Sequence, residues 1–275
     1  MAISINSLPN LGGLMQSQRA QQLALARLAS GQRINNAADD PAGLVIAEQL
    51  DTYANGLEQA GRNTEIGIAM AQTADGGLEQ TMSIIQQQRE LALQAANTGT
   101  MDENQLSALN AQFHALGKSL DMVAANTSFA GRPLLDGSYR NQTLQLGASA
   151  GDTVQVDIAS RITGQPAGFG AQGLGLAGLD LSNPEDVLAR LDAAGEAVLQ
   201  QRGALGALQA NTLETNASSL SVARENLLSA VSTIRDTDYA KDASDLVGSQ
   251  IRNQAGLAML AQGNQHASRV LQLLS

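Results

Sequence analysis

The sequence has no cysteine and no tryptophan, and aromatic residues make up only 2% of it. Without cysteine it has no disulfide, no thiolate nucleophile and no cysteine-based zinc site. Enzyme cores and ligand pockets commonly rest on aromatic side chains, so their scarcity argues against an enzyme. Hydrophobic residues nevertheless reach 43%. A core of aliphatic side chains and alanine suits long helices packed side by side.

Positive charge is also scarce. The chain has 16 lysines and arginines against 26 aspartates and glutamates, a formal net charge of −10. This balance argues against nonspecific nucleic-acid binding and against an electrostatic anchor on anionic lipid. The sequence contains no run of 18 apolar residues, so we expect no membrane partner. Residues 1–13 lack a basic region followed by an apolar stretch, so we expect no cleaved signal peptide.

No pattern in the sequence places a catalytic, metal or cofactor site. The two histidines, His114 and His266, lie outside the H-E-x-x-H pattern and have no carboxylate cluster beside them in the sequence. The glycine-rich segment 164–178 lacks the signature of a phosphate-binding loop. We therefore expect no enzymatic activity and no cofactor.

Long helices dominate the pattern. Asp39-Asp40-Pro41 is typical of a helix start, with an aspartate cap and a proline at the first helical position. Helix-forming sequence continues to about Asn97, which would give a helix about 80 Å long at roughly 1.5 Å per residue. After a turn at residues 97–100, a second helix opens at Asp102. Its apolar residues recur at alternating spacings of three and four, which is typical of a coiled-coil seam: Leu106, Leu109, Phe113, Leu116, Leu120 and Val123.

The middle of the chain changes character. Leu144 and Leu146 alternate with polar residues, residues 147–151 resemble a turn, and residues 153–158 alternate again, which together predict a β-hairpin. A glycine-rich loop follows. Pro184, with acidic residues directly after it, then indicates the start of another helix that runs to about residue 234.

Both ends of the chain predict amphipathic helices rich in glutamine and asparagine. Neither helix can cover its apolar stripe alone, and a pair would still leave apolar surface exposed. We therefore expect both ends to become ordered only when many copies meet. The stripe of the first helix is marked by Leu14, Leu25 and Leu28, and that of the last helix by Leu257, Leu260 and Leu271.

These patterns predict a mainly α fold, a long antiparallel helical hairpin or coiled-coil bundle with a small β-hairpin region. We expect two parts. Residues 1–40 and 236–275 would form paired terminal helices. Residues 41–235 would form a helical rod, with the β-hairpin at about 130–165 and a short glycine-rich loop at about 164–182.

Residues 28–44 resemble the N-terminal signature of bacterial flagellins, and residues 236–265 resemble the C-terminal signature. Residues 73–97 and 144–158 also resemble flagellin segments, so the similarity covers nearly the whole chain. The resemblance assigns the matched signature positions to assembly. They are Arg33, Asn35, Asp39, Asp40, Asp236, Asp238, Tyr239 and Gln254.

The resemblance implies a structural subunit that polymerises into the flagellar filament for motility. The terminal helices would form the inner core of the filament, and the variable outer domain of larger flagellins would be absent. The implied partners are other copies of the chain, the hook-junction and filament-cap proteins, and a flagellar export chaperone. The implied location is extracellular, reached through the flagellar type III apparatus.

The resemblance also implies a patch that the vertebrate Toll-like flagellin receptor binds. Many flagellins carry an arginine where this chain has Gln87 and a glutamate where it has Gln112. Losing two charged anchors predicts weak recognition. The candidate patch consists of Gln87, Arg89, Glu90, Leu91 and Gln112.

Two alternatives share the same helical ends. One is a hook–filament junction protein, and the other is a surface-exposed flagellin-like adhesin. The matches at residues 73–97 and 143–158 favour the filament subunit. An adhesin groove would need aromatic platforms or an inserted domain, and the sequence indicates neither.

Overall fold

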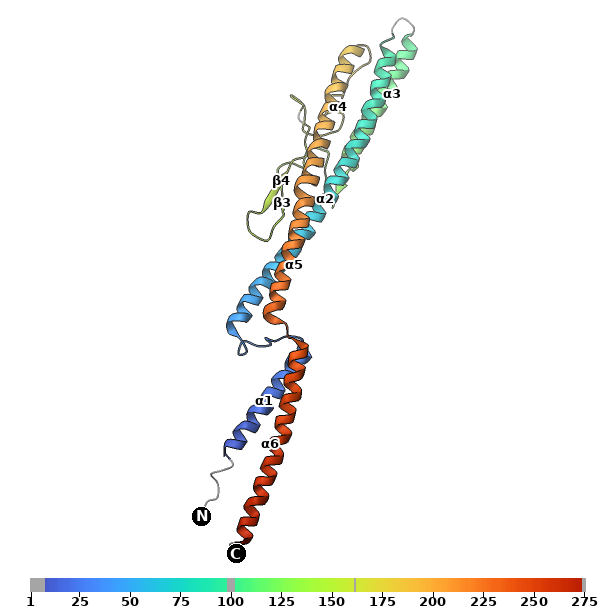
Figure 1. The fold of residues 1–275 in the computed structure, drawn as a ribbon. Coiled ribbons are helices and arrows are strands. Elements are labelled where there is room, and N and C mark those ends of the chain that lie inside the picture. The colour runs from blue at the N-terminus through green and yellow to red at the C-terminus, as the bar shows by residue number, and fades with distance from the viewer. Residues whose placement is uncertain (1–7, 98–101, 161, 274–275) are drawn as a thin grey trace. The chain divides into compact units, whose positions relative to one another are not determined.

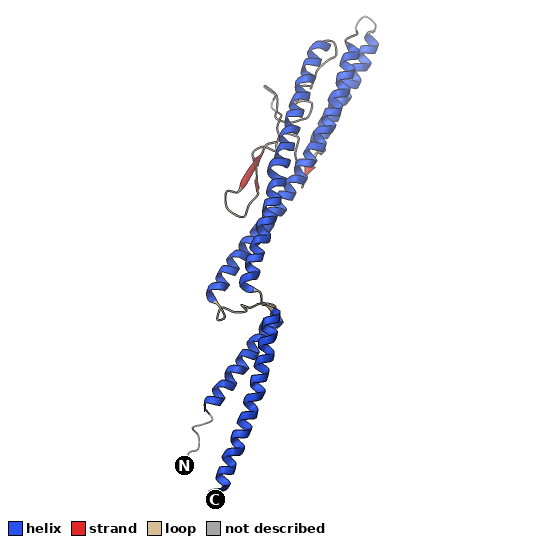
Figure 2. Ribbon diagram, viewed as in Figure 1, coloured by secondary structure: helices blue, strands red, loops and turns tan. Residues whose placement is uncertain are grey.

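The computed structural model describes residues 8–97, 102–160 and 162–273, and most of them are helical (Figures 1 and 2). The predicted mainly α fold with a small antiparallel sheet region is therefore confirmed. The turn predicted at residues 97–100 lies largely outside the described residues. The elements in chain order are α1 Leu8–Ser30, α2 Pro41–Ala95, α3 Glu103–Asn126, β1 Ser128–Phe129, β2 Arg132–Pro133, β3 Gln142–Gln145, β4 Thr153–Val156, α4 Pro184–Ala207, the π-helix η1 Leu208–Glu214, α5 Thr215–Arg235 and α6 Tyr239–Leu273.

The chain divides into two compact units. Unit 1 consists of Met1–Ala54 and Glu225–Ser275, and unit 2 consists of Asn55–Arg224. Helices α2 and α5 each contribute to both units. Unit 1 therefore joins segments from the two ends of the sequence.

Helix α2 begins where the sequence predicted. Oδ1 of Asp40 accepts a hydrogen bond from the backbone N–H of Gly43 at 2.9 Å, so Asp40 caps the helix. The helix continues through its internal glycines. At Gly77 a Cβ atom would lie 2.6 Å from Oγ1 of Thr127 and 2.7 Å from a methyl carbon of Leu135. Glycine is needed there because neighbouring elements approach the helix backbone closely.

Helix α3 carries a capping box, in which Asp102 and Gln105 each accept a hydrogen bond from the other's backbone N–H. Its buried side chains follow the predicted seam at first and then drift from it. At the C-terminal end Ala124 is buried in place of Val123, because 3.6 residues per turn do not match a 3.5-residue repeat. The fully buried positions are Leu109, Phe113, Leu120 and Ala124, while Leu106 and Leu116 are half-buried.

The predicted hairpin is confirmed as strands β3 and β4, which pair antiparallel with Leu144 opposite Val154. The shorter pair β1 and β2 was not predicted from the sequence. The glycine-rich loop, which was expected only as a loop, has little regular structure but contributes side chains to the core. Four of its side chains are almost fully buried in unit 2, beside the helices α2, α3 and α4: Phe169, Leu174, Leu176 and Leu181.

The predicted continuous helix from Pro184 to about residue 234 contains a π-helical segment. In α4 the buried residues recur every three or four positions up to Leu205. The next buried residues are Leu213, eight positions later, and Leu220, seven positions after that. The step from Leu205 to Leu213 is therefore one residue longer than the seven-residue repeat of the buried face. The wider turn of η1 accommodates it and keeps Leu213 on the buried face.

Candidate assembly surface

Helices α1 and α6 of unit 1 pack along each other and run antiparallel (Figure 1). Leu14, near the start of α1, packs against Gly256, whereas Arg27, near its end, lies 4.0 Å from Asp242. Between these ends, the contacts are polar. The hydroxyl of Ser17 donates to the carbonyl oxygen of Ser249 at 3.0 Å, and the amide of Asn253 donates to Gln21 at 2.7 Å.

The α1–α6 pair buries mainly polar and small side chains between its helices and exposes large apolar side chains on its outer surface. The side chains buried at the seam are Ser17, Ala24, Asp242, Ser249 and Asn253. Helices of a folded domain usually bury their apolar stripe instead. Here seven large apolar side chains are between 46% and 67% exposed: Met15, Leu23 and Leu25 on α1, and Val247, Ile251, Leu257 and Met259 on α6.

In the single chain, part of the predicted apolar stripes lies on the outer surface of the pair. Leu25 and Leu257, which were expected on these stripes, are 47% and 55% exposed. The seam of α6 runs through Ser249 and Gly256, because small residues let the two backbones come close. Leu260 is half-buried, as are Leu14 and Leu28. The side chain of Leu271 lies outside the described residues.

The connecting segments of unit 1 pair with each other through main-chain hydrogen bonds. The N–H of Thr237 donates to the carbonyl of Gly31 at 3.0 Å, and the N–H of Arg33 donates to that of Arg235 at 2.7 Å. The guanidinium of Arg33 also donates to the carbonyl of Ile234. We call these paired segments, residues 31–33 and 234–237, the clasp.

The remaining signature residues mostly shape this region. Oδ2 of Asp39 accepts from the N–H groups of Asn35 and the next residue, both at 3.1 Å. Asp238 caps α6 by accepting from the N–H groups of Ala240 and Lys241. The carboxylate of Asp236 accepts a hydrogen bond from the hydroxyl of Ser232 at 2.6 Å. Tyr239 and Gln254 are exposed.

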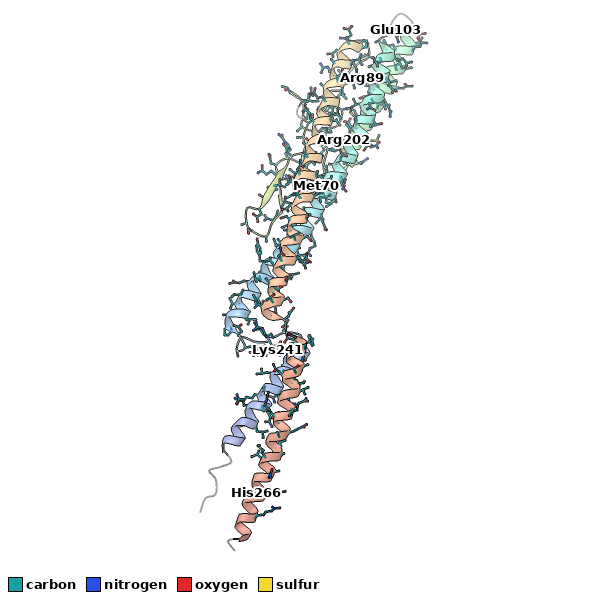
Figure 3. All side chains as sticks on the ribbon, in the orientation of Figure 1. Met70, Arg89, Glu103, Arg202, Lys241 and His266 are labelled. Carbon is teal, nitrogen blue, oxygen red and sulfur yellow. The ribbon has the colours of Figure 1, made fainter. Side chains whose placement is uncertain are left out.

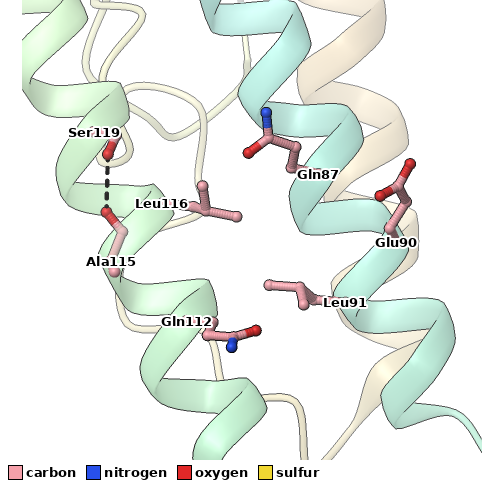
Figure 4. Close-up of a pocket in the computed structure, with 7 residues that line it drawn as sticks. All are labelled: Gln87, Glu90, Leu91, Gln112, Ala115, Leu116 and Ser119. Carbon is pink, nitrogen blue, oxygen red and sulfur yellow. Dashed lines mark hydrogen bonds between the residues drawn. The ribbon is translucent and has the colours of Figure 1, made fainter.

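Four of the five residues of the candidate receptor patch line one hollow of about 440 Å³ in unit 2 (Figure 4). Gln87, Glu90 and Leu91 come from α2, and Gln112 comes from α3 with Ala115, Leu116 and Ser119. Arg89 is not among the lining residues. It forms an ion pair with Asp192 of α4.

Arginine–carboxylate pairs join the helices of unit 2. Arg202 of α4 donates to Asp75 of α2 at 2.7 Å, and this hydrogen bond raises the pKa of the guanidinium. Arg224 of α5 donates to Glu58 of α2 at 2.7 Å. The pKa of the Glu58 carboxyl lies below its ordinary value, first because of its hydrogen bond with Arg62 and then because of the charge of Arg224. Figure 3 labels Arg89 and Arg202 on their helices.

Within the described residues, no three His, Cys, Asp or Glu side chains come together as metal ligands would. His114 packs edge-on against Phe113, at 6.3 Å between ring centroids, and His266 is exposed on α6. None of the helices in the described part of the chain is long and apolar enough to cross a bilayer.

Comparison with known proteins relates the chain to one family. Residues 3–140 match the family model of the bacterial flagellin N-terminal helical region, and residues 188–274 match that of the C-terminal helical region. A flagellin of Halalkalibacterium halodurans is 38% identical over 275 residues, which cover 98% of this chain and 97% of that protein. A flagellin of Bacillus subtilis is 38% identical over 307 residues and is covered to 98%, as is this chain.

A third relative is the flagellar filament 30.7 kDa core protein of Treponema maltophilum, which is 37% identical over 262 residues covering 91% of each chain. Two family models match in order along the sequence, and the relatives match over nearly their full length. The chain therefore belongs to the bacterial flagellins, the non-catalytic structural subunits of the extracellular flagellar filament.

Proposed function

We propose that the outward apolar side chains of α1 and α6 form the surface through which copies of this chain pack in the core of the filament. One observation carries the proposal: the pair places polar groups between its helices and seven large apolar side chains outside. Val247 and Ile251 lie one turn apart, on the face of α6 opposite Ser249 and Asn253. Large apolar side chains that a single chain leaves exposed together usually mark a surface that a partner covers.

A double substitution on α6 tests this surface. In the single chain Val247 is 53% exposed and Ile251 is 60% exposed, so both still have apolar area to bury. The change Val247→Gln with Ile251→Gln should raise the critical concentration for filament growth by about tenfold or more, at about 1 kcal/mol for each half-exposed side chain. Sedimentation and electron microscopy of purified protein measure this.

The matched control is Asp245→Asn with Arg252→Gln, which changes two exposed residues of α6 but neither net charge nor apolar area. It should leave the critical concentration within about twofold of the parent value. Equal growth of the Val247/Ile251 variant and the control would refute the proposed surface. Circular dichroism should show the same helix content in all the proteins at high concentration.

The same proposal gives each part of the chain a place in the filament. Residues 1–40 and 236–275 would form the inner core, and residues 41–235 the surrounding tube. A chain lacking residues 1–35 and 240–275 should remain folded in unit 2, because the core of that unit lies within Met70–Leu205. It should not form filaments. Filament growth by this truncated chain would contradict the assignment.

Electron microscopy also separates this function from the first alternative. A hook–filament junction protein should not grow long filaments alone, whereas a filament subunit should. The adhesin alternative predicts strong and reproducible binding on a glycan array. The name of the Treponema relative, a filament core protein, favours the filament subunit.

Further partners belong to this proposal. Hook-junction and filament-cap proteins would bound the filament, and an export chaperone would cover the terminal helices before secretion through the flagellar type III apparatus. Retention of the chain inside cells whose flagellar export gate is inactivated tests this route. Normal secretion from such cells would contradict it.

Weak recognition by the Toll-like receptor is also proposed, because the hollow between α2 and α3 is lined by the uncharged Gln87 and Gln112. In a receptor reporter assay the double variant Gln87→Arg with Gln112→Glu should be at least tenfold more potent than the parent chain. Equal potency of the two proteins would contradict this view of the patch.

A further inference from the structure

The Asn253–Gln21 hydrogen bond and the Arg27–Asp242 pair favour the observed alignment of α1 and α6, but the small residues of the seam specify it weakly. On α6 the small residues Ser249, Gly256 and Gly263 are spaced seven apart. A slip of α1 by seven residues would therefore exchange Ser249 for Gly256, and Gly256 for Gly263, at the same places of the seam. The hydroxyl of Ser17 bonds a main-chain carbonyl, a group that every turn of a helix repeats.

The clasp, in contrast, has only one alignment. Helix α1 ends at Ser30 and α6 begins at Tyr239. The carbonyl of Gly31 accepts from the N–H of Thr237, so the end of one helix is held level with the start of the other. Gln32 and Asp236 form the β-bridge between these bonds.

Gly31 is the residue that allows this connection. Its φ angle is +72°, a left-handed conformation that glycine adopts without strain and asparagine tolerates better than alanine does. Its N–H donates to the carbonyl of Arg27 at 2.8 Å, which ends α1. A Cβ atom at Gly31 would lie 3.3 Å from the hydroxyl of Tyr239.

We propose that the clasp, rather than the helix faces, sets the register of α1 against α6, and that Gly31 is its positioning residue. The inference rests on the proposed assembly surface, because the arrangement of the outward apolar side chains depends on this register. Gly31 and Arg33 thereby gain a role in assembly without belonging to the packing surface.

Spin labels measure the register directly. The chain has no cysteine of its own, so cysteines at the exposed positions Gln22 and Gln250 give two unique labels. Pulsed electron paramagnetic resonance measures the distance between the two labels in filaments where labelled chains are diluted among unlabelled parent chains. Tyr239→Phe removes the hydroxyl near Gly31 and serves as the background. In it, Gly31→Ala is compared with Gly31→Asn.

We expect one narrow distance in the Tyr239→Phe background and in its Gly31→Asn variant. The Gly31→Ala variant should give further distances, because a slip of seven residues moves one label by roughly 10 Å along the helix axis, or should fail to enter filaments that the asparagine variant enters. Gly13→Ala makes the same chemical change inside α1, with nothing within 4 Å of the new Cβ, and should keep the single distance.

Two results would overturn the proposal. The first is a single parental distance in the alanine variant. The second is the same disturbance in the alanine and asparagine variants, because the left-handed backbone would then not be the cause. Filament yield of the unlabelled proteins is scored separately by sedimentation. The yield tests the assembly surface and the distance tests the register, so either can fail without the other.

Discussion

Deletion of Ala210 should be nearly harmless, although deletions inside a helix usually are not. The residue lies in η1, where eight positions separate the buried Leu205 and Leu213. Without Ala210 the separation becomes seven, the spacing of the rest of the seam. The π turn can then relax to an ordinary α-helix, and the buried face stays aligned. We expect a change of less than about 1 kcal/mol in the free energy of unfolding, the scale of one hydrogen bond.

Deletion of Ser218 is the matched comparison, because it shortens the seven-residue step between Leu213 and Leu220 to six. Either Leu220 turns outward or Leu213, which is fully buried, leaves its place. The loss of Leu213 would cost about 1.5–3 kcal/mol. Asn216 would also lose its hydrogen bonds to Thr64 and to the carbonyl of Leu146, at about 1 kcal/mol each.

The expected cost of deleting Ser218 is therefore about 1.5–5 kcal/mol, with the lower part of this range if Leu220 turns outward and the upper part if Leu213 leaves its place. Urea unfolding followed by circular dichroism measures both deletions. With a slope of about 3 kcal/mol per M, the midpoint should fall by about 0.5 M or more for the second deletion and by less for the first. Equal losses for the two deletions would refute the idea that η1 accommodates an extra residue.

Three further predictions concern unit 2. Gly77→Ala should lower the free energy of unfolding by about 1–3 kcal/mol, because the new Cβ would meet neighbouring side chains closely. Gly76→Ala, with nothing within 4 Å of its new Cβ, should raise the free energy of unfolding by about 0.5–1 kcal/mol. Thermal melts that rank the two variants the other way would contradict this. Asp102→Ala should cost about 1 kcal/mol by removing the capping box of α3, and an unchanged urea midpoint would count against it. The pKa of Glu58 is lowered by Arg62, so its contribution to stability is present above the unfolded-state pKa and is lost as the pH falls through the folded-state value. Glu58→Gln should therefore make the free energy of unfolding fall less steeply as the pH is lowered. Parallel plots of the free energy of unfolding against pH for variant and parent would exclude this contribution.

The sequence predicted the local features well, because each depends on nearby residues. The caps at Asp40 and Asp102 mark the starts of α2 and α3, and the hairpin at residues 142–156 follows from its alternation. The signal for η1 was also present. The eight-residue step from Leu205 to Leu213 departs from the repeat, but a helix-forming sequence alone does not tell whether a π turn or a twist of the seam absorbs it.

The terminal helices were predicted less well, for a physical reason. Helix α6 carries apolar residues on several sides, so periodicity cannot show which side faces α1. The choice depends on how closely two backbones approach, and small residues such as Ser249 and Gly256 decide it. The clasp joins residues about 200 positions apart mostly by main-chain hydrogen bonds, which leave no pattern in side-chain type.

The polar seam between α1 and α6 has a consequence for how the chain reaches its destination. Water can replace the hydrogen bonds of Ser17, Gln21 and Asn253 at little net cost. The two helices can therefore separate without exposing a large apolar surface between them, and they can pair again afterwards. Such reversible closure is compatible with the proposed export through the flagellar type III apparatus, after which the two helices would pair.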